Sequence, residues 1–163
     1  MDTPGITQDQ LPDIRVTFPG DRRVDADMGS RTIRTDQSVP HGGGDTAPEP
    51  FELFLASLAT CAGYYVLGFC RTRGIPVDGI ELIQHHQLDE LTNRLIRVDI
   101  TLQLPITFPE RYRSAVLQAA AACKVKRLLM APPEVVVRIQ PAAASPVAVG
   151  PGPFAVPVPF FRP

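Results

Sequence analysis

The chain has 163 residues, a hydrophobic fraction of 44% and a formal net charge of −1, which suits one soluble domain of ordinary size. The mixed charges give no electrostatic basis for binding nucleic acid or an anionic membrane. The N-terminus lacks the charged-then-apolar pattern of a signal peptide and the three cysteines argue against a disulfide framework, so we expect reduced thiols in the cytoplasm.

The first third of the chain predicts a leader, three short strands and a loop. Residues 1–13 are polar and predict a mobile leader. Alternation with period two predicts short antiparallel strands at residues 14–18, 23–28 and 31–36. Residues 37–50 form a loop with three consecutive glycines. A phosphate-binding loop is disfavoured, because no Gly-Lys-Ser/Thr sequence follows the glycines.

Residues 51–70 predict the helix around which the fold is built. The segment is apolar almost all the way round, which is typical of a helix buried on all sides. Arg71 and Gly74 favour the end of the helix just beyond it. Ser57 and Thr60 interrupt the apolar run, so we interpret the segment as a core helix and not as a membrane span.

The next part of the chain predicts a hairpin and a second helix. Alternating apolar residues at 79–83 and 95–104 predict two strands that pair with each other. Thr107 is followed three residues later by Glu110, which is the pattern of a capping box. Helical spacing then predicts one continuous helix over residues 109–130.

The end of the chain predicts a last strand at residues 134–139 and an irregular Pro-rich tail at 141–163. The folded domain is therefore expected over residues 14–140. The order of three strands, helix, two strands, helix and strand predicts an α+β fold with an antiparallel sheet. The long apolar helix needs more cover than one small sheet provides, so we expect a homodimer.

Cys61 and Cys123 are the residues most able to carry chemistry. Each lies within a predicted helix, and packing of the two helices could bring the thiols within disulfide reach, about 4.4–6.8 Å between α-carbons. Alternatively both are small hydrophobic core residues, and spacing alone favours this interpretation. Cys70 lies on the opposite side of its helix from Cys61 and is interpreted as structural. A reactive thiolate needs a nearby cation; Arg31 or Arg34 could supply it, or both are solvated strand charges.

Other chemistry has less support in the sequence. His41, His85 and His86 lack metal-ligand spacing, and adjacent histidines on a strand point to opposite faces. We therefore expect neither a metal nor another cofactor. A Cys–His hydrolase site is disfavoured, because no cysteine stands at an exposed turn from strand to helix.

Two segments resemble the OsmC/Ohr family. Residues 50–61 resemble the helix that carries the first cysteine of the family, and residues 121–125 resemble the second-cysteine helix. Asp36, the loop at residues 42–45 and the order of strands and helices also match. The likeness extends over roughly residues 14–140. Its signature is a pair of cysteines, each in its own helix.

The resemblance implies an intertwined α+β homodimer that reduces organic hydroperoxides at two interface sites. By this resemblance Cys61 is the peroxidatic thiolate and Cys123 is the resolving thiol that forms a disulfide with it. An external dithiol, a lipoyl group in one branch of the family, then restores the pair. Arg31 is the first choice for the activating cation. Apolar neighbours of Cys61 would favour fatty or aromatic hydroperoxides: Phe54, Leu58, Tyr64 and Tyr65.

One position departs from the family pattern. The hydroperoxidase branches have a glutamate directly after the proline that opens the helix, whereas here Phe51 holds that place and Glu52 follows it. On a regular helix Glu52 faces away from Cys61. It is therefore either a catalytic residue that serves the site by another route or a cap of the helix N-terminus. The departure motivates a second hypothesis, a non-catalytic dimer that binds a small hydrophobic ligand.

Overall fold

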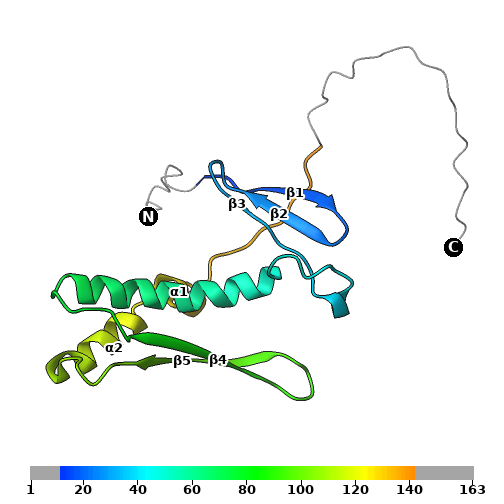
Figure 1. Cartoon of the computed structure of the whole chain (residues 1–163). Coiled ribbons are helices and arrows are strands. Elements are labelled where there is room, and N and C mark those ends of the chain that lie inside the picture. Colours follow the sequence, from blue (N-terminus) through cyan, green and yellow to red (C-terminus); the bar gives the residue numbers. More distant parts are fainter. Residues whose placement is uncertain (1–11, 142–163) are drawn as a thin grey trace, which may run out of the picture. The chain divides into compact units, whose positions relative to one another are not determined.

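The computed structural model describes residues 12–141, which fall into a unit that ends at Pro132 and a second unit that begins at Pro133 (Figure 1). The predicted leader lies outside the described residues except for residues 12 and 13. The predicted tail lies outside them except for Pro141. Each unit is considered by itself.

The N-terminal part of the first unit is a three-stranded antiparallel sheet in the order β1-β2-β3. Its strands are β1 (Arg15–Gly20), β2 (Arg23–Asp27) and β3 (Thr32–Ile33). The sequence predicted all three strands, but β3 is only two residues long. The chain leaves the ladder after Ile33, although Thr35 still accepts a hydrogen bond from the N–H of Val24 at 3.2 Å. Beyond Thr35 the backbone is held by loop contacts instead of by the sheet.

Helix α1 (Pro50–Arg71) is the longest element, as predicted. Its buried residues recur every fourth position and form one stripe: Leu58, Ala62, Val66 and Cys70. The expectation that the helix is buried on all sides is not met within one chain, since Tyr64 is 72% exposed. With 22 residues and a mean hydropathy of 1.7, α1 is long and apolar enough to cross a membrane. The core helix of a soluble protein can have the same length and composition.

The predicted hairpin is confirmed. Strands β4 (Glu81–Leu88) and β5 (Leu95–Gln103) pair antiparallel, with Leu82 opposite Leu102. The turn is closed by Asp89, whose carboxylate accepts the N–H of Thr92 at 2.8 Å. The hairpin packs beside α1 through β4 (Figure 1).

The prediction of one helix over residues 109–130 is wrong in its continuity. The segment is a short 3₁₀ turn, η2 (Glu110–Tyr112), followed by α2 (Arg113–Ala121) and α3 (Lys124–Met130). The helix is interrupted at Cys123, whose backbone is not helical and whose sulfur accepts the N–H of Lys126 at 3.4 Å. Cys123 is therefore the N-cap of α3, where a side-chain acceptor satisfies one of the free N–H groups of the first turn.

The capping box predicted from Thr107 and Glu110 is also absent. Pro109 precedes η2 without a side-chain cap, and Glu110 instead pairs with Arg113 at 2.6 Å. A true capping box occurs at the start of α1. There the N–H of Glu49 donates to the carboxylate of Glu52 at 2.9 Å, and the Glu49 side chain accepts the N–H of Glu52 in return.

The core of the first unit lies where α1, α2 and the hairpin meet. Val66 and Cys70 of α1 pack with Val116 of α2 and with Phe108, and all four are buried. Cys70 is fully buried, and burial raises the pKa of its thiol. These observations agree with a structural role for Cys70, since a buried cysteine behaves as a small hydrophobic residue.

The predicted strand at residues 134–139 is not formed in the second unit. The described residues from 133 to 141 contain no strand, and apolar side chains there reach solvent; Val137 is 91% exposed. A strand needs a partner for its ladder, and among the described residues none is bonded to this segment. The described fold is thus α+β with two antiparallel sheets in place of one, and its last regular element is α3.

Candidate functional site

The structure brings together the two cysteines that the sequence singled out. Cys61 lies in the middle of α1 and is half-buried, whereas Cys123 is 2% exposed at the break between α2 and α3. Both are free thiols, and the thiol of Cys123 hydrogen-bonds to the sulfur of Cys61. The Cys123 sulfur also lies 3.9 Å from the carbonyl oxygen of Leu58, one turn before Cys61 on α1.

The surroundings of Cys61 favour its ionised form. Desolvation raises the pKa of the thiol and is the largest single influence on it. Hydrogen bonds from the N–H of Val125, the thiol of Cys123 and the N–H of Lys124 act in the opposite direction, and the charge of Arg127 adds to them. These groups outweigh desolvation, so the pKa of Cys61 lies below its ordinary value.

Cys123 is shifted the other way. Burial raises the pKa of its thiol, and the neighbouring sulfur of Cys61 raises it further. Of the two cysteines, Cys61 therefore loses its proton first. The pair consists of a half-buried thiol with a lowered pKa and a buried thiol with a raised pKa.

The break in the second helix makes this environment. Lys124 and Val125 are the first two residues of α3, so their N–H groups have no partner within the helix. In a continuous helix these groups would be bonded to carbonyl oxygens one turn earlier, and they could not reach Cys61. Sequence analysis missed this pair of donors because it predicted an unbroken helix.

Arg127 is a site residue that sequence analysis also missed. Its Nη2 donates a hydrogen bond to the hydroxyl of Tyr65 at 3.4 Å. A signal was present in the sequence, because Arg127 follows Cys123 by four residues just as Tyr65 follows Cys61. Residues four apart on a helix lie on the same face.

The two arginines expected to activate Cys61 lie elsewhere in the chain. Arg31 is exposed just before β3, and its backbone carbonyl accepts the N–H of Met28 at 2.8 Å. Arg34 is exposed just after β3. Neither is among the groups that shift the pKa of Cys61 within the chain. The assignment of Arg31 to the site remains a prediction.

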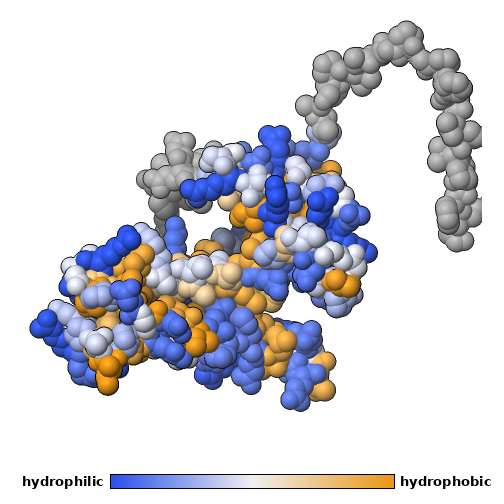
Figure 2. Space-filling view, in the orientation of Figure 1, coloured by the Kyte–Doolittle hydropathy of each residue, from blue (hydrophilic) through white to orange (hydrophobic). Residues whose placement is uncertain are grey.

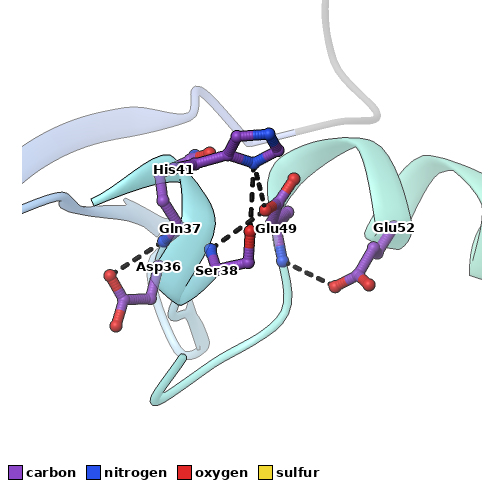
Figure 3. Close-up of polar contacts among 6 residues, drawn as sticks. All are labelled: Asp36, Gln37, Ser38, His41, Glu49 and Glu52. Carbon is purple, nitrogen blue, oxygen red and sulfur yellow. Dashed lines mark hydrogen bonds and ion pairs between the residues drawn. The ribbon is translucent and has the colours of Figure 1, made fainter. Parts of the chain in front are cut away.

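Glu52 lies in the first turn of α1 and forms the capping box with the N-cap residue Glu49 (Figure 3). Its partner Glu49 belongs to a wider network, since the Glu49 carboxylate accepts the N–H of Ser38 at 3.0 Å and contacts Nδ1 of His41 at 2.9 Å. Hydrogen bonds from Ser38 and then His41 lower the pKa of Glu49 to about 2. Of the two interpretations of Glu52, its geometry in one chain matches the cap.

The glycine loop before α1 is organised by Asp36. This buried carboxylate accepts four hydrogen bonds: from the N–H groups of Gln37 at 2.8 Å, Gly44 at 3.2 Å and Thr46 at 3.0 Å, and from the Thr46 hydroxyl at 2.7 Å. The hydroxyl and N–H of Thr46 are the main cause of a pKa of about 2 for Asp36. Gly43 passes so close to Gln37 that an added Cβ would lie 1.9 Å from its carbonyl oxygen. The loop thus binds its own carboxylate where a phosphate loop would bind an anion.

An apolar cavity of about 380 Å³ is lined by Cys123 but not by Cys61. Of the predicted pocket residues only Leu58 lines it. Phe54 stacks on Phe51 at 5.9 Å between ring centroids, Tyr64 is exposed, and Tyr65 contacts Arg127. The lining comes from α1, β5, α2 and α3: Leu58, Ala62, Val98, Ile100, Leu102, Leu117, Ala120, Ala121, Cys123, Lys126, Leu129 and Met130.

Comparisons with known proteins agree on one family and one fold. The family model described as OsmC-like protein matches residues 42–138. A putative osmotic stress induced and detoxification response protein from Psychrobacter arcticus is 22% identical, with a TM-score of 0.60 over 78% of this chain and 90% of that one. An OsmC-like protein from Mycoplasma pneumoniae is 14% identical, with a TM-score of 0.60 over 76% and 90%.

A third similar structure is an organic hydroperoxide resistance protein OsmC from Legionella pneumophila. It is 14% identical, with a TM-score of 0.50 over 77% of this chain and 93% of that one. No curated protein matches the sequence. At these identities the likeness to solved structures establishes the fold alone.

Proposed function

The chain belongs to the OsmC-like protein family, and on that premise we propose that it is a thiol-dependent reductase of organic hydroperoxides. The observation that carries the proposal is the contact between Cys61 and Cys123, together with the opposite shifts of their pKa values. A lowered pKa at a partly accessible cysteine beside a second thiol is the arrangement that two-cysteine redox chemistry needs. The Legionella relative, named for organic hydroperoxide resistance, supports the same class of substrate.

In the proposed reaction the Cys61 thiolate attacks the terminal oxygen of the hydroperoxide. The O–O bond breaks, the alkoxide takes up a proton and leaves as an alcohol, and Cys61 becomes a sulfenic acid. Cys123 then attacks the Cys61 sulfur, and the sulfenic oxygen leaves as water while the disulfide forms. An external dithiol, of the lipoyl type that the family resemblance implies, returns both cysteines to thiols by exchange.

The proposal includes a homodimer. Apolar side chains that a monomer leaves in solvent support it. Phe18 of β1 is 80% exposed, Tyr64 of α1 is 72% exposed, and Val137 lies in a valine-rich segment that has no strand partner among the described residues. Hydrophobic side chains also reach the surface in several places on the face drawn in Figure 2. A second copy could cover these side chains, and burial of exposed apolar area stabilises association.

A second candidate function is the binding of a small hydrophobic ligand without turnover. Two observations favour it: the apolar cavity of about 380 Å³ has the size of a small-molecule site, and Glu52 caps a helix. In this case Cys123 is a wall of the cavity, and the contact between the cysteines has no catalytic consequence.

Peroxide titration separates the two candidates. One equivalent of cumene hydroperoxide is added to the reduced protein, and intact mass and peptide mapping follow within seconds. A Cys61–Cys123 disulfide that is absent in a Cys61→Ser variant is expected for the reductase. Cys70→Ala serves as the matched control, and it should form the disulfide as the wild type does. Thiols that stay reduced, or that oxidise no faster than Cys70, would contradict the reductase and favour the ligand-binding protein.

A further inference from the structure

Two pairs of side chains face each other across α1 and α3. Cys61 contacts Cys123, and Tyr65 accepts a hydrogen bond from Arg127. In each helix the second member follows the first by four residues, which is about 6 Å along the axis. The backbone N–H of Arg127 donates to the carbonyl of Cys123 at 3.0 Å, so the two residues occupy successive turns. Arg127 therefore lies one turn beyond Cys123, and its guanidinium reaches the Tyr65 hydroxyl on α1.

We propose that Arg127 is the cation that stabilises the Cys61 thiolate, and that Tyr65 is the positioning residue that holds its guanidinium in place. This inference rests on the proposed function, because it assigns an electrostatic role around the sulfur that attacks the peroxide. It places the activating cation on the same chain and helix as the resolving cysteine.

The geometry distinguishes Arg127 from other cations of the elements packed on α1. On α2, Arg113 is paired with Glu110 at 2.6 Å, so its charge is compensated. On α3, Lys126 lines the apolar cavity. Arg127 combines a fixed guanidinium with a lowering effect on the pKa of Cys61. The remaining ionisable side chains of these elements are Glu81, His85, His86 and Lys124.

A long, flexible side chain at the surface loses much of its electrostatic effect when it moves in water. The Tyr65 hydroxyl limits that movement, because it gives one Nη a hydrogen-bond acceptor on α1. Loss of the hydroxyl should therefore weaken the effect of Arg127 without removing the charge. Loss of the Arg127 charge should therefore raise the pKa of Cys61 more than loss of the Tyr65 hydroxyl, and this difference separates the stabilising residue from the positioning residue.

The test is the pKa of the Cys61 thiolate, measured without any peroxide. The rate of alkylation of Cys61 by iodoacetamide is followed from pH 4 to 10 by peptide mapping. Arg127→Met should raise the apparent pKa of Cys61, and alkylation at low pH should become slower. Arg127→Lys, which keeps a charge, should restore most of the shift. Tyr65→Phe should raise the pKa by a smaller amount.

Arg94→Met is the matched control, because it removes one exposed arginine charge at the far end of the β4–β5 hairpin and should leave the pKa unchanged. An unchanged pKa in Arg127→Met overturns the proposal, as does an equal rise in Arg94→Met. A rise in the pKa of Cys61 in Arg31→Met, with no rise in Arg127→Met, assigns the role to Arg31 instead. If Arg127→Met fails to fold, Arg127→Gln takes its place, and a wild-type pKa of Cys61 in that variant overturns the proposal. Thiols inert to peroxide but with a pKa that depends on Arg127 would refute the reductase and leave this inference standing.

Discussion

The start of α1 and its middle both hold groups with lowered pKa values, but they differ in what those groups can do. Asp36 and Glu49 lie before the helix, and fixed N–H and hydroxyl donors occupy their carboxylates. Cys61 lies in the helix, is half-buried and has a second thiol as one of its donors. A lowered pKa thus indicates structure where the charge is satisfied internally, and reactivity where the group is accessible beside a reactive partner.

The cysteines give the largest expected effect on activity. Cys61→Ser should abolish hydroperoxide reduction while it leaves the stability of the fold nearly unchanged, because the side chain is half-buried and similar in size. Cys70→Ala should do the reverse. It should keep activity and lower the free energy of unfolding by about 1–2 kcal/mol, since it removes a buried group from the core. Turnover assays with cumene hydroperoxide measure the activity of both variants, and urea unfolding measures their stability. An equal loss of activity in Cys61→Ser and Cys70→Ala would contradict the distinction between a reactive and a structural cysteine.

The glycine loop gives the largest expected effect on structure. Gly43→Ala would place a Cβ 1.9 Å from the Gln37 carbonyl oxygen, so the loop must move, at a cost of more than about 2 kcal/mol. Gly68→Ala is the matched substitution in α1, where nothing lies within 4 Å of the added Cβ. It should stabilise the protein by about 0.5–1 kcal/mol, because alanine loses less backbone entropy than glycine in a helix. Thermal unfolding compares the two, and a loop that tolerates Gly43→Ala would contradict the geometry.

Asp36 makes the stability of the loop depend on pH. Its folded-state pKa of about 2 lies below its unfolded value of 3.8, so ionisation of the carboxyl group stabilises the folded state relative to the unfolded chain. The contribution is complete above about pH 4 and is lost as the pH falls toward 2, because the unfolded chain binds the proton first. Asp36→Asn removes the charge and part of the acceptor capacity. It should lower Tm by roughly 5 °C at pH 7, with a smaller difference from the wild type at pH 2.

Glu49 also has a pKa of about 2, so its contribution to stability is lost over the same pH range and it cannot serve as a control. The control is therefore Asp89→Asn. Asp89 also has a lowered pKa, caused mainly by the Thr92 hydroxyl, but it lies in the exposed turn between β4 and β5. That variant should shift Tm by less than Asp36→Asn at both pH values. A difference between Asp36→Asn and the wild type that does not narrow on acidification would show that the loss is not electrostatic.

Much of the fold could be predicted from local pattern. The apolar run around Cys61 predicted α1, and strict alternation over residues 95–104 predicted the strand that became β5. The break at Cys123 could not be predicted, because small residues and Lys124 around it are good helix formers and cysteine is not a typical N-cap. Since the break creates the donors to Cys61, the sequence indicated the cysteine pair but not the source of its electrostatics.

Two other features depend on contacts far apart in the sequence. The role of Asp36 arises from four bonds to residues as distant as Thr46, which no period of two or 3.6 reveals. The three valines and the isoleucine at residues 134–139 favour a strand, but a ladder also needs a neighbour, and within the described residues none pairs with it. Periodicity reports which face of a segment is apolar, and it does not identify the surface that covers that face.

Glu52 gives the smallest expected effect and tests both regions at once. It lies in the first turn of the helix that carries Cys61, and its carboxylate accepts the Glu49 N–H at 2.9 Å. If it acts only as a cap, Glu52→Gln keeps an acceptor and should leave activity and stability near the wild type. Glu52→Ala should cost about 0.5–1 kcal/mol of stability with unchanged kcat/KM. A tenfold loss of kcat/KM in Glu52→Gln without a loss of stability would mean that the carboxylate serves the reaction, and the division between a structural helix start and a reactive helix middle would fail at this residue.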